Sequence, residues 1–310
     1  MNRCPITYQT CDGYYSAKGL RLLSRSLTEL KELPFSAPEL RREAAARSDK
    51  ISIQGVQPKL SARLNIKKQQ FELCNRNGRY ILKPQIAEYR EVPENEDLTM
   101  RLAGLAGIEI PLHGLLYGRN KELTYFIRRF DRVGRKSKIH VEDFAQLAEL
   151  SRDTKYRSSM EKVSALIEKY CTFPAVEKVK LFRLTLFCFL VGNEDMHLKN
   201  FSIIYKDDVI ALSPAYDLLN TTIVLPKPEE ELALPLNGKK NRLRQHDLID
   251  YFGRDQLQLT DRVINKLLME LKQLRKPWKA LLKISFLSNI MKEKYLGVLD
   301  KRFERLFGQE

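Results

Sequence analysis

The stretch Gly192-Asn193-Glu194-Asp195-Met196-His197-Leu198-Lys199-Asn200-Phe201-Ser202 places a cluster of polar residues directly after an apolar run. An aspartate followed five residues later by an asparagine, on a loop at a helix end, can aim a carboxylate at a substrate hydroxyl and an amide oxygen at a nucleotide-bound metal. Asp217, which ends Ser213-Pro214-Ala215-Tyr216-Asp217, returns a second carboxylate to the same edge. Oxygen ligands from Asn and Asp suit Mg²⁺. Asp195, Asn200 and Asp217 therefore predict a phosphoryl-transfer site.

The same residues also allow structural interpretations. Asp195 and Asn200 both belong to the residue types that favour turns and helix caps. His197 is expected to bond the loop or a phosphate, with simple packing as the alternative. Zinc ligation is disfavoured because the three other histidines do not stand at ligand spacing.

The second half of the chain is expected to be mostly helical around this loop. Apolar residues recur at helical spacing in residues 141–150, 159–170, 175–191, 260–273 and 279–307. Two short β-like pieces, residues 201–205 and 209–212, bracket Lys206-Asp207-Asp208 as a hairpin. Such a hairpin would carry the chain from Asn200 back to Asp217.

The first half of the chain predicts a small antiparallel sheet with one helix packed against it. Strands are expected at residues 59–66, 70–74, 80–82 and 123–128. The second and third would be joined by a hairpin turn at Asn75-Arg76-Asn77-Gly78, because Asn-Gly suits positive φ angles. Pro93 opens a helix through about residue 106, with acidic residues in its first turn.

Phosphoryl transfer also needs positive charge near the phosphates. Lys83 closes the apolar strand Tyr80-Ile81-Leu82, and Glu96 in the following helix could hold its ammonium group in place. A strand-end lysine taken alone would ordinarily be solvated. The aspartates and the asparagine downstream favour phosphate binding instead.

The composition fits a cytoplasmic protein with one large domain or two lobes. A chain of 310 residues buries enough surface to need no disulfide or structural metal. Its five cysteines are odd in number and include no C-x-x-C pair. The first residues lack the apolar run of a secretory signal, and the longest apolar stretch, residues 184–191, is too short to span a membrane.

The net charge of +15 is concentrated at residues 128–138 and 239–244. Basic runs of this kind attract polyanions, although they also occur as solvated loops. Nucleic acid, nucleotide phosphates or an acidic protein surface are the candidate partners.

The Asp-x-His-x-x-Asn pattern with its distal aspartate resembles the catalytic loop of protein kinases, aminoglycoside phosphotransferases and phosphoinositide kinases. Six ordered motifs over residues 52–217 distinguish among these families. They are Ser52-Ile53-Gln54-Gly55-Val56-Gln57-Pro58-Lys59-Leu60, Tyr80-Ile81-Leu82-Lys83-Pro84, Asn95-Glu96 with Met100 and Leu102-Ala103, Arg129-Phe130-Asp131-Arg132, His140-Val141-Glu142-Asp143-Phe144, and Asp195 to Ser202. Together they resemble the HipA toxin kinases. Because the chain reaches its glycine loop by Gly55, it is similar to the shorter HipT type, in which a separate small protein supplies the N-terminal subdomain.

The resemblance implies an α+β, two-lobed, protein-kinase-like (HipA-like) fold. A small mixed β-sheet would form the N-terminal lobe, residues 1–127, with the glycine loop, the phosphate-binding lysine and a helix equivalent to αC. Residues 128–310 would form a mostly helical C-terminal lobe with the catalytic loop and the metal-binding aspartate.

The resemblance also implies a role for each candidate residue. Asp195 would be the catalytic base, supported by Lys83 and His197, while Asn200 and Asp217 would hold Mg²⁺. The nucleotide-binding residues would be Gly55, Val56, Gln57, Lys83, Glu96, Arg129, Phe130, Asp131 and His197, and Ser52 would be an autophosphorylation site. Two positions depart from the family pattern: Arg128 stands where the nucleotide hinge has a glutamate, and Gln54 replaces a second serine of the glycine loop.

The implied function is an ATP- and Mg²⁺-dependent serine/threonine protein kinase that acts as the toxin of a toxin–antitoxin system. Its protein substrate would be a translation component such as an aminoacyl-tRNA synthetase. Implied partners are a small HipS-like protein that supplies the missing subdomain and a HipB-like helix-turn-helix antitoxin, through which alone the chain would meet DNA. Two alternatives remain open: a small-molecule kinase of the aminoglycoside-phosphotransferase type, and a non-catalytic nucleic-acid-associated protein.

Overall fold

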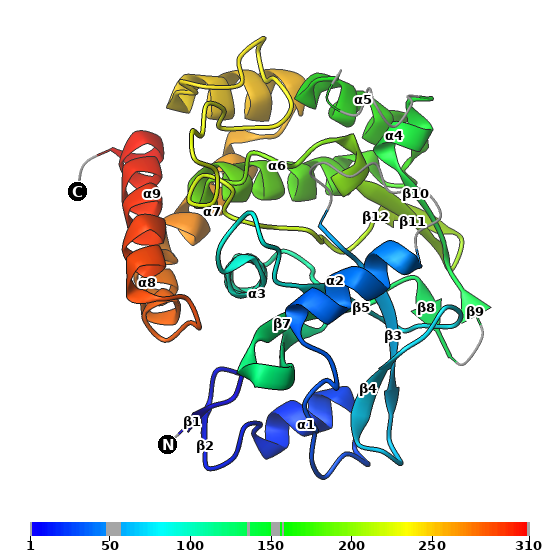
Figure 1. Ribbon diagram of the computed structural model, residues 1–310. Coiled ribbons are helices and arrows are strands. Elements are labelled where there is room, and N and C mark those ends of the chain that lie inside the picture. The colour runs from blue at the N-terminus through cyan, green and yellow to red at the C-terminus, as the bar shows by residue number, and fades with distance from the viewer. Residues whose placement is uncertain (1, 48–56, 135–136, 150–155, 157, 309–310) are drawn as a thin grey trace. The chain divides into compact units, whose positions relative to one another are not determined.

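The computed structural model describes residues 2–47, 57–134, 137–149, 156 and 158–308. The chain forms two compact units, coloured along the sequence in Figure 1. Unit 1 comprises Met1–Leu98, Pro111–Ser137 and Ile284–Leu287, and unit 2 comprises Thr99–Ile110, Lys138–Lys283 and Ser288–Glu310. The sequence predicts one break after residue 127, whereas the units exchange several segments, since helix α3 (Val92–Leu105) contributes residues to both.

Unit 1 is built on a sheet that has five strands in the described part of the chain, in the order β4-β3-β5-β7-β6. All of its pairings are antiparallel, as the strand pattern predicts, so the sheet is not the mixed one that the family resemblance implies. The bounds are β3 Leu60–Asn65, β4 Gln70–Leu73, β5 Tyr80–Pro84, β6 His113–Tyr117 and β7 Leu123–Arg128. Strand β6 is absent from the sequence prediction.

The predicted hairpin between β4 and β5 is wrong. Both strands pair with β3, on its opposite sides, so the chain crosses an end of β3 between them. Gly78 makes this crossing possible, because a Cβ there would lie 1.9 Å from Ser61 Oγ. The positive φ expected for the turn belongs to Asn77, at 58°.

Two helices with side-chain caps and several shorter elements accompany this sheet. Helix α1 (Ala17–Leu23) starts at Ser16, whose hydroxyl accepts from Gly19 N. Helix α2 (Ala37–Ala46) starts with a capping box between Ser36 and Glu39 and packs against β3 and β5. Strands β1 (Asn2–Arg3) and β2 (Thr10–Cys11) pair with each other, as do β8 (Arg132–Val133) and β9 (Ser137–Lys138), and a 3-10 helix spans Arg119–Lys121.

Helix α6 (Pro174–Val191) lies at the centre of unit 2 and contacts helices α5 (Met160–Tyr170) and α9 (Asn289–Phe307). Pro174 opens α6 at a position where no intrahelical N–H is needed. Apolar side chains surround its second half, and nearly all of them are buried. No described helix is both long enough and apolar enough to span a lipid bilayer.

A second sheet in unit 2 has the order β10-β11-β12 and is antiparallel. Its strands are β10 His140–Asp143, β11 Ser202–Lys206 and β12 Val209–Leu212. The helix predicted over residues 141–150 is therefore wrong in its first turn. Asp143 ends β10 and caps the short helix α4 (Phe144–Leu147), because its carboxylate accepts from Gln146 N at 2.9 Å.

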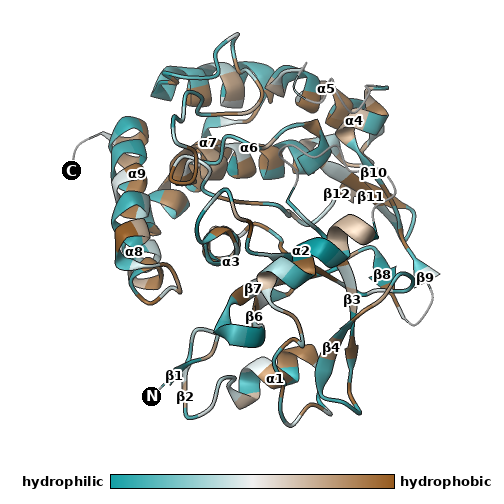
Figure 2. Cartoon of the chain, viewed as in Figure 1, coloured by the Kyte–Doolittle hydropathy of each residue, from teal (hydrophilic) through white to brown (hydrophobic). Residues whose placement is uncertain are grey.

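Among the remaining helices of unit 2, α7 (Asp261–Gln273) follows its predicted range. The π-helix over Asp247–Gln256 is absent from the sequence prediction. The single helix expected over residues 279–307 is two helices, α8 (Arg275–Lys283) and α9. Ser288 starts α9 as its N-cap, which explains the break. Figure 2 shows both hydrophilic and hydrophobic surfaces on α9, whose buried residues are Met291, Tyr295, Leu299, Arg302, Phe303 and Leu306.

Candidate active site

The loop that carries Asp195 begins at a glycine that no other residue could replace without strain. Gly192 ends α6 with φ 71°, in the left-handed region. A Cβ at this position would lie 2.7 Å from Thr222 Oγ1 and 2.8 Å from Val298 Cγ1. Its carbonyl oxygen accepts from the hydroxyls of Thr221 and Thr222 at 3.1 and 3.0 Å. These contacts fix the backbone conformation with which the loop leaves α6.

The backbone of Asp195 is held by two asparagines. Asn193 Oδ1 accepts from Asp195 N at 3.0 Å, and Asn200 Nδ2 donates to Asp195 O at 2.8 Å. Because a carbonyl oxygen can only accept, it is the amide nitrogen of Asn200 that faces it, and Oδ1 remains as an oxygen donor for a metal. The Thr221 hydroxyl adds a further brace by accepting from Glu194 N at 2.8 Å.

The chain from Asn200 to Asp217 is one hairpin whose two ends are tied together. Ser213 N donates to Ser202 O at 2.9 Å, just beyond the paired strands β11 and β12. The Tyr216 hydroxyl donates to Lys199 O at 2.9 Å and receives the Ser202 hydroxyl proton at 2.5 Å. Both candidate metal ligands therefore leave the same end of the hairpin.

The backbone of Asp217 adopts φ 56°, in the left-handed region that few non-glycine residues enter. Unusual conformations of this kind persist where the surrounding structure holds them, and they concentrate at functional sites. Asp217 is also close enough for its charge to raise the pKa of Tyr216, although burial is the larger cause of that shift.

A tyrosine from outside the loop contacts the carboxylate of Asp195. The hydroxyl of Tyr156, a residue shortly before α5, donates to Asp195 Oδ1 at 2.7 Å. Its ring meets the ring of buried His197 edge-on, with centroids 5.0 Å apart. His197 Nε2 itself lies 3.8 Å from Asp195 Oδ1, which is too long for a hydrogen bond. About half of the Asp195 side chain remains exposed.

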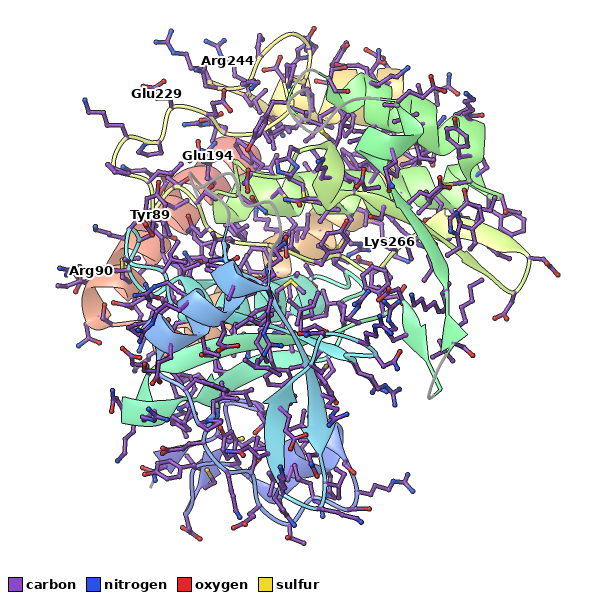
Figure 3. All side chains as sticks on the ribbon, turned by 45° about the vertical axis from the view of Figure 1, so that its right-hand side comes forward. Tyr89, Arg90, Glu194, Glu229, Arg244 and Lys266 are labelled. Carbon is purple, nitrogen blue, oxygen red and sulfur yellow. The ribbon has the colours of Figure 1, made fainter. Side chains whose placement is uncertain are left out.

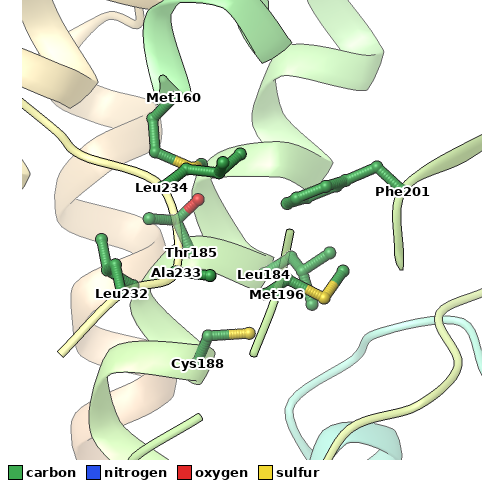
Figure 4. A pocket seen from close by; sticks show the side chains of 9 residues that line it. All are labelled: Met160, Leu184, Thr185, Cys188, Met196, Phe201, Leu232, Ala233 and Leu234. Carbon is green, nitrogen blue, oxygen red and sulfur yellow. The ribbon is translucent and has the colours of Figure 1, made fainter. Parts of the chain in front are cut away.

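Apolar side chains pack against the loop that carries Asp195. Met196 and Phe201 point into a small cavity with residues of α6 and of the segment after residue 231 (Figure 4). Its lining residues are Met160, Leu184, Thr185, Cys188, Met196, Phe201, Leu232, Ala233 and Leu234. Met196 and Phe201 therefore anchor the loop that carries Asp195 among apolar side chains of unit 2.

Glu194 joins this loop to the segment that follows residue 226. Its Oε2 accepts from Glu230 N at 3.0 Å, and burial raises the pKa of its carboxyl group. Glu229 and Arg244, labelled with Glu194 in Figure 3, belong to the same side of unit 2. In the basic run at residues 239–244, Lys239 forms an ion pair with Asp247 at 2.7 Å, and Lys240 forms one with Glu230 at 3.0 Å. These two positive charges are therefore paired with acidic groups of the same chain.

In unit 1, Lys83 and Glu96 form a buried ion pair, as the sequence predicts. The ammonium group of Lys83 donates to Glu96 Oε1, and both side chains are about 2% exposed. Lys83 sits at the end of β5, and Glu96 lies on the first half of α3. Whether this pair serves a nucleotide stays a prediction at this point.

A second buried pair, which sequence reasoning missed, lies beside the first. His113 Nδ1 is 2.8 Å from Asp97 Oδ1, and both side chains are buried. The ring of Tyr125 lies 5.5 Å from Lys83 Nζ and 5.9 Å from the His113 ring. The adjacent acids of α3, Glu96 and Asp97, thus each hold a basic group next to one aromatic ring.

The predicted adenosine-binding segment forms a tight cluster after β7. Arg129 binds the carboxylate of Asp131 through two hydrogen bonds of 3.0 and 2.7 Å, and Arg132 adds a third at 2.5 Å. Phe130 lies between them in the sequence and is half-buried, as is Gln57. Ser52, Gly55 and Val56 lie outside the described residues.

The structure thus brings together Asp195, His197, Asn200 and the hairpin to Asp217 in unit 2, and Lys83 with Glu96 in unit 1. Sequence reasoning missed Tyr156, Asn193 and Thr221. The polar run Asn220-Thr221-Thr222, shortly after Asp217, is a signal that could have indicated the brace. The flanks of Tyr156 carry no comparable signal.

Comparison with known proteins decides the family. The family described as the HipA-like C-terminal domain matches residues 51–278. The chain belongs to this family. The HipA-like match includes Lys83, Asp195 and Asp217 and ends within α8.

Two curated relatives illustrate the extent of similarity. A putative kinase of Haemophilus influenzae is 34% identical over 242 residues, which make up 73% of this chain and 69% of the relative. The serine/threonine-protein kinase toxin HipA of Shewanella oneidensis is 28% identical over 211 residues, 61% of this chain and 47% of the toxin. The chain therefore spans about two thirds of the first relative and about half of the second.

A solved structure confirms the predicted HipA-like fold. HipA in the complex of Shewanella oneidensis HipA and HipB with operator DNA matches 91% of this chain and 73% of its own, with a TM-score of 0.70. The sequence identity in this comparison is 24%, so the fold is shared although most side chains differ.

Proposed function

We propose that the chain is an ATP- and Mg²⁺-dependent serine/threonine protein kinase. The observation that carries the proposal is the braced loop at Asp195 in a member of the HipA-like family. The candidate base, Asp195, has a half-exposed carboxylate on a backbone held by hydrogen bonds. Asn200 offers an amide oxygen from the same loop. General-base assistance of this kind contributes roughly 10²- to 10⁴-fold to a rate.

Each candidate residue has a defined task in this proposal. Asp195 accepts the proton of the acceptor hydroxyl as the phosphoryl group is transferred. Lys83 supplies positive charge to the phosphates of the nucleotide, and Glu96 holds its ammonium group in one place. Protein positioning and charge neutralisation account for most of the catalysis in phosphoryl transfer.

The donor set of Asn200 and Asp217 fits Mg²⁺. One amide oxygen and one carboxylate are hard ligands, and Mg²⁺ commonly binds one or two carboxylates and completes its shell with waters and phosphate oxygens. When bound, the ion would neutralise charge on the transferring phosphates. The bond from Asn200 Nδ2 to Asp195 O leaves the amide oxygen of Asn200 available to hold the ion.

We further propose that this activity makes the chain the toxin of a toxin–antitoxin system. The support is the similarity to the Shewanella relative named a serine/threonine-protein kinase toxin, and to a structure in which HipA is bound by HipB and operator DNA. The proposed substrate is a translation component such as an aminoacyl-tRNA synthetase, phosphorylated in the cytoplasm. A HipB-like antitoxin and a small HipS-like protein are the proposed partners, with DNA reached only through the antitoxin.

Ser52 is the proposed site of autophosphorylation. A phosphate there would add about −1.5 to −2 charges near the triphosphate and oppose nucleotide binding. Intact-mass measurement after incubation with Mg·ATP tests this, comparing wild type with Ser52→Ala. Equal phosphate incorporation in the two proteins, or none in wild type, would rule the site out.

Labelled ATP added to a cell lysate with the purified chain tests the activity itself. We expect labelled protein bands with wild type and at least a 100-fold weaker signal with Asp195→Asn, since the amide cannot take a proton. Label confined to soluble metabolites would favour a small-molecule kinase. No transfer, together with binding of DNA by the chain alone at physiological salt, would favour the nucleic-acid-associated alternative.

A further inference from the structure

The hydrogen bond from Tyr156 to Asp195 joins a residue outside the catalytic loop to the candidate base. Tyr156 precedes α5, whereas Asp195 follows α6. Its hydroxyl donates to Oδ1 over 2.7 Å, a normal length for a bond to a charged acceptor. The hydrogen bond from Tyr156 therefore reaches the carboxylate that acts as the base in the proposed reaction.

The ring of Tyr156 is itself held by its surroundings. It meets His197 at 87°, in an edge-on arrangement that aromatic rings favour. Lys240 Nζ lies 5.9 Å from the ring centroid, within cation–π range, and its ammonium group is also bound to Glu230. Tyr156 is thus placed by the catalytic loop and by the segment after residue 226 together, although 41% of it is exposed.

The backbone bonds of Asp195 do not fix its carboxylate. Asn193 and Asn200 hold the main chain only, and the side chain is half-exposed. A short carboxylate in such a place can rotate between solvent-facing positions. The Tyr156 hydroxyl stops this rotation at Oδ1, and burial together with the negative charge of Asp195 raises the pKa of Tyr156, so the phenol keeps its proton at neutral pH.

A carboxylate offers about four acceptor positions on its two oxygens, so one bond at Oδ1 does not exclude a substrate hydroxyl. We propose that Tyr156 is a positioning residue for Asp195: its hydroxyl holds Oδ1 and thereby turns the second oxygen toward the acceptor hydroxyl. The proposal rests on the proposed kinase function. It assigns Tyr156 no contact with substrate or nucleotide.

Tyr156→Phe removes the hydroxyl and keeps the ring against His197. We expect kcat for phosphoryl transfer to fall about 10- to 100-fold, the cost of a misplaced catalytic group, while KM for ATP changes less than about 2-fold. Tyr251→Phe is the matched control, because it deletes a similar bond, from Tyr251 to Glu161 at 3.0 Å, far along the chain from the loop. This control should leave kcat unchanged.

A double-mutant cycle shows whether Tyr156 acts through Asp195. In an Asp195→Ala background, Tyr156→Phe should change the residual rate by less than about 2-fold. The same four proteins unfolded in urea give a readout that needs no activity: the loss of stability in the double variant should be smaller than the sum of the two single losses. Additive losses would show that the bond does not form, and would overturn the proposal.

The outcomes separate this inference from the proposed function. If wild type transfers phosphate and Tyr156→Phe has the same kcat, the positioning role fails while the kinase stands. If Tyr156→Phe raises kcat, the hydroxyl blocks the base and the proposal is overturned in the opposite direction. If wild type transfers no phosphate to any acceptor, the proposed function itself fails, whatever the urea experiment shows.

Discussion

Lys83 and Glu96 form an ion pair that is almost completely withdrawn from solvent. Two charges in such a place are costly unless each satisfies the other, so removing one partner should cost about 3–5 kcal/mol of folding free energy. We expect this loss for Glu96→Leu, measured by urea unfolding at neutral pH. The double variant Lys83→Met/Glu96→Leu should recover most of it, because apolar side chains of similar volume can replace a buried pair.

The double variant also separates folding from function. If Lys83 binds phosphates, the stable double variant should still lack phosphoryl transfer. A double variant that folds and keeps wild-type turnover would contradict the assignment of Lys83.

Asp217→Asn tests the metal site. A ligand lost from the metal should raise the Mg²⁺ concentration for half-maximal transfer roughly 10-fold or more, given that even supporting residues of metal sites cost 10- to 100-fold. Asp208→Asn is the matched control, since Asp208 lies exposed at the tip of the same hairpin with φ 60°. An identical Mg²⁺ response in both variants would remove Asp217 from the ligand set.

Gly192→Ala should destabilise the protein by about 2–4 kcal/mol, the sum of a left-handed backbone and a crowded methyl group. Gly238→Ala isolates the first contribution, because Gly238 has the same φ of 71° and nothing within 4 Å of a Cβ. We expect about 1 kcal/mol from that control. Thermal or urea unfolding of the two variants measures the difference, and equal losses would show that the contacts at Gly192 yield without cost.

Glu94 predicts a pH dependence of stability. Burial raises the pKa of its carboxyl group from the usual 4.5 to about 7, and its Oε2 has no hydrogen-bond partner within the described residues. The folded state therefore binds more protons than the unfolded state between these values, so this group lowers stability as the pH rises from about 4.5 to 7. Glu94→Gln should be more stable than wild type by about 3 kcal/mol at pH 8.

The gain from Glu94→Gln should vanish near pH 4, where the carboxyl group is protonated in both states. Urea midpoints of the two proteins at pH 4, 6 and 8 check the trend. A constant difference across this range would mean that Glu94 is ionised in the folded protein.

The fold could be predicted where a local pattern decides it. Helices α5, α6 and α7 begin within one residue of the expected positions, since apolar spacing and caps such as Ser159 are local signals. Strand partners are not local: β4 and β5 were located, yet both pair with β3. The break between α8 and α9 is not predicted, because the apolar pattern continues across it and only the cap at Ser288 marks it.

For the candidate site too, local sequence patterns predict some residues, while others come from distant parts of the chain. Asp195, Asn200 and Asp217 stand at a recognisable spacing, and the pairing of Lys83 with Glu96 follows from a strand end and the next helix. The groups that hold these residues come from distant parts of the chain. Tyr156 reaches Asp195 across 39 positions, and Thr221 reaches Glu194 across 27, so no short window of sequence contains either bond.

The Tyr216 hydroxyl ties together the two ends of the hairpin that carry Asn200 and Asp217. Tyr216 spans its two ends through Lys199 and Ser202, so the two oxygen donors cannot drift apart independently. In the proposed metal site, a cation that arrives with a nucleotide would meet two ligands whose backbones are already linked. Its affinity would then depend mainly on the phosphates that accompany it, because the link between the two ends does not require a bound nucleotide.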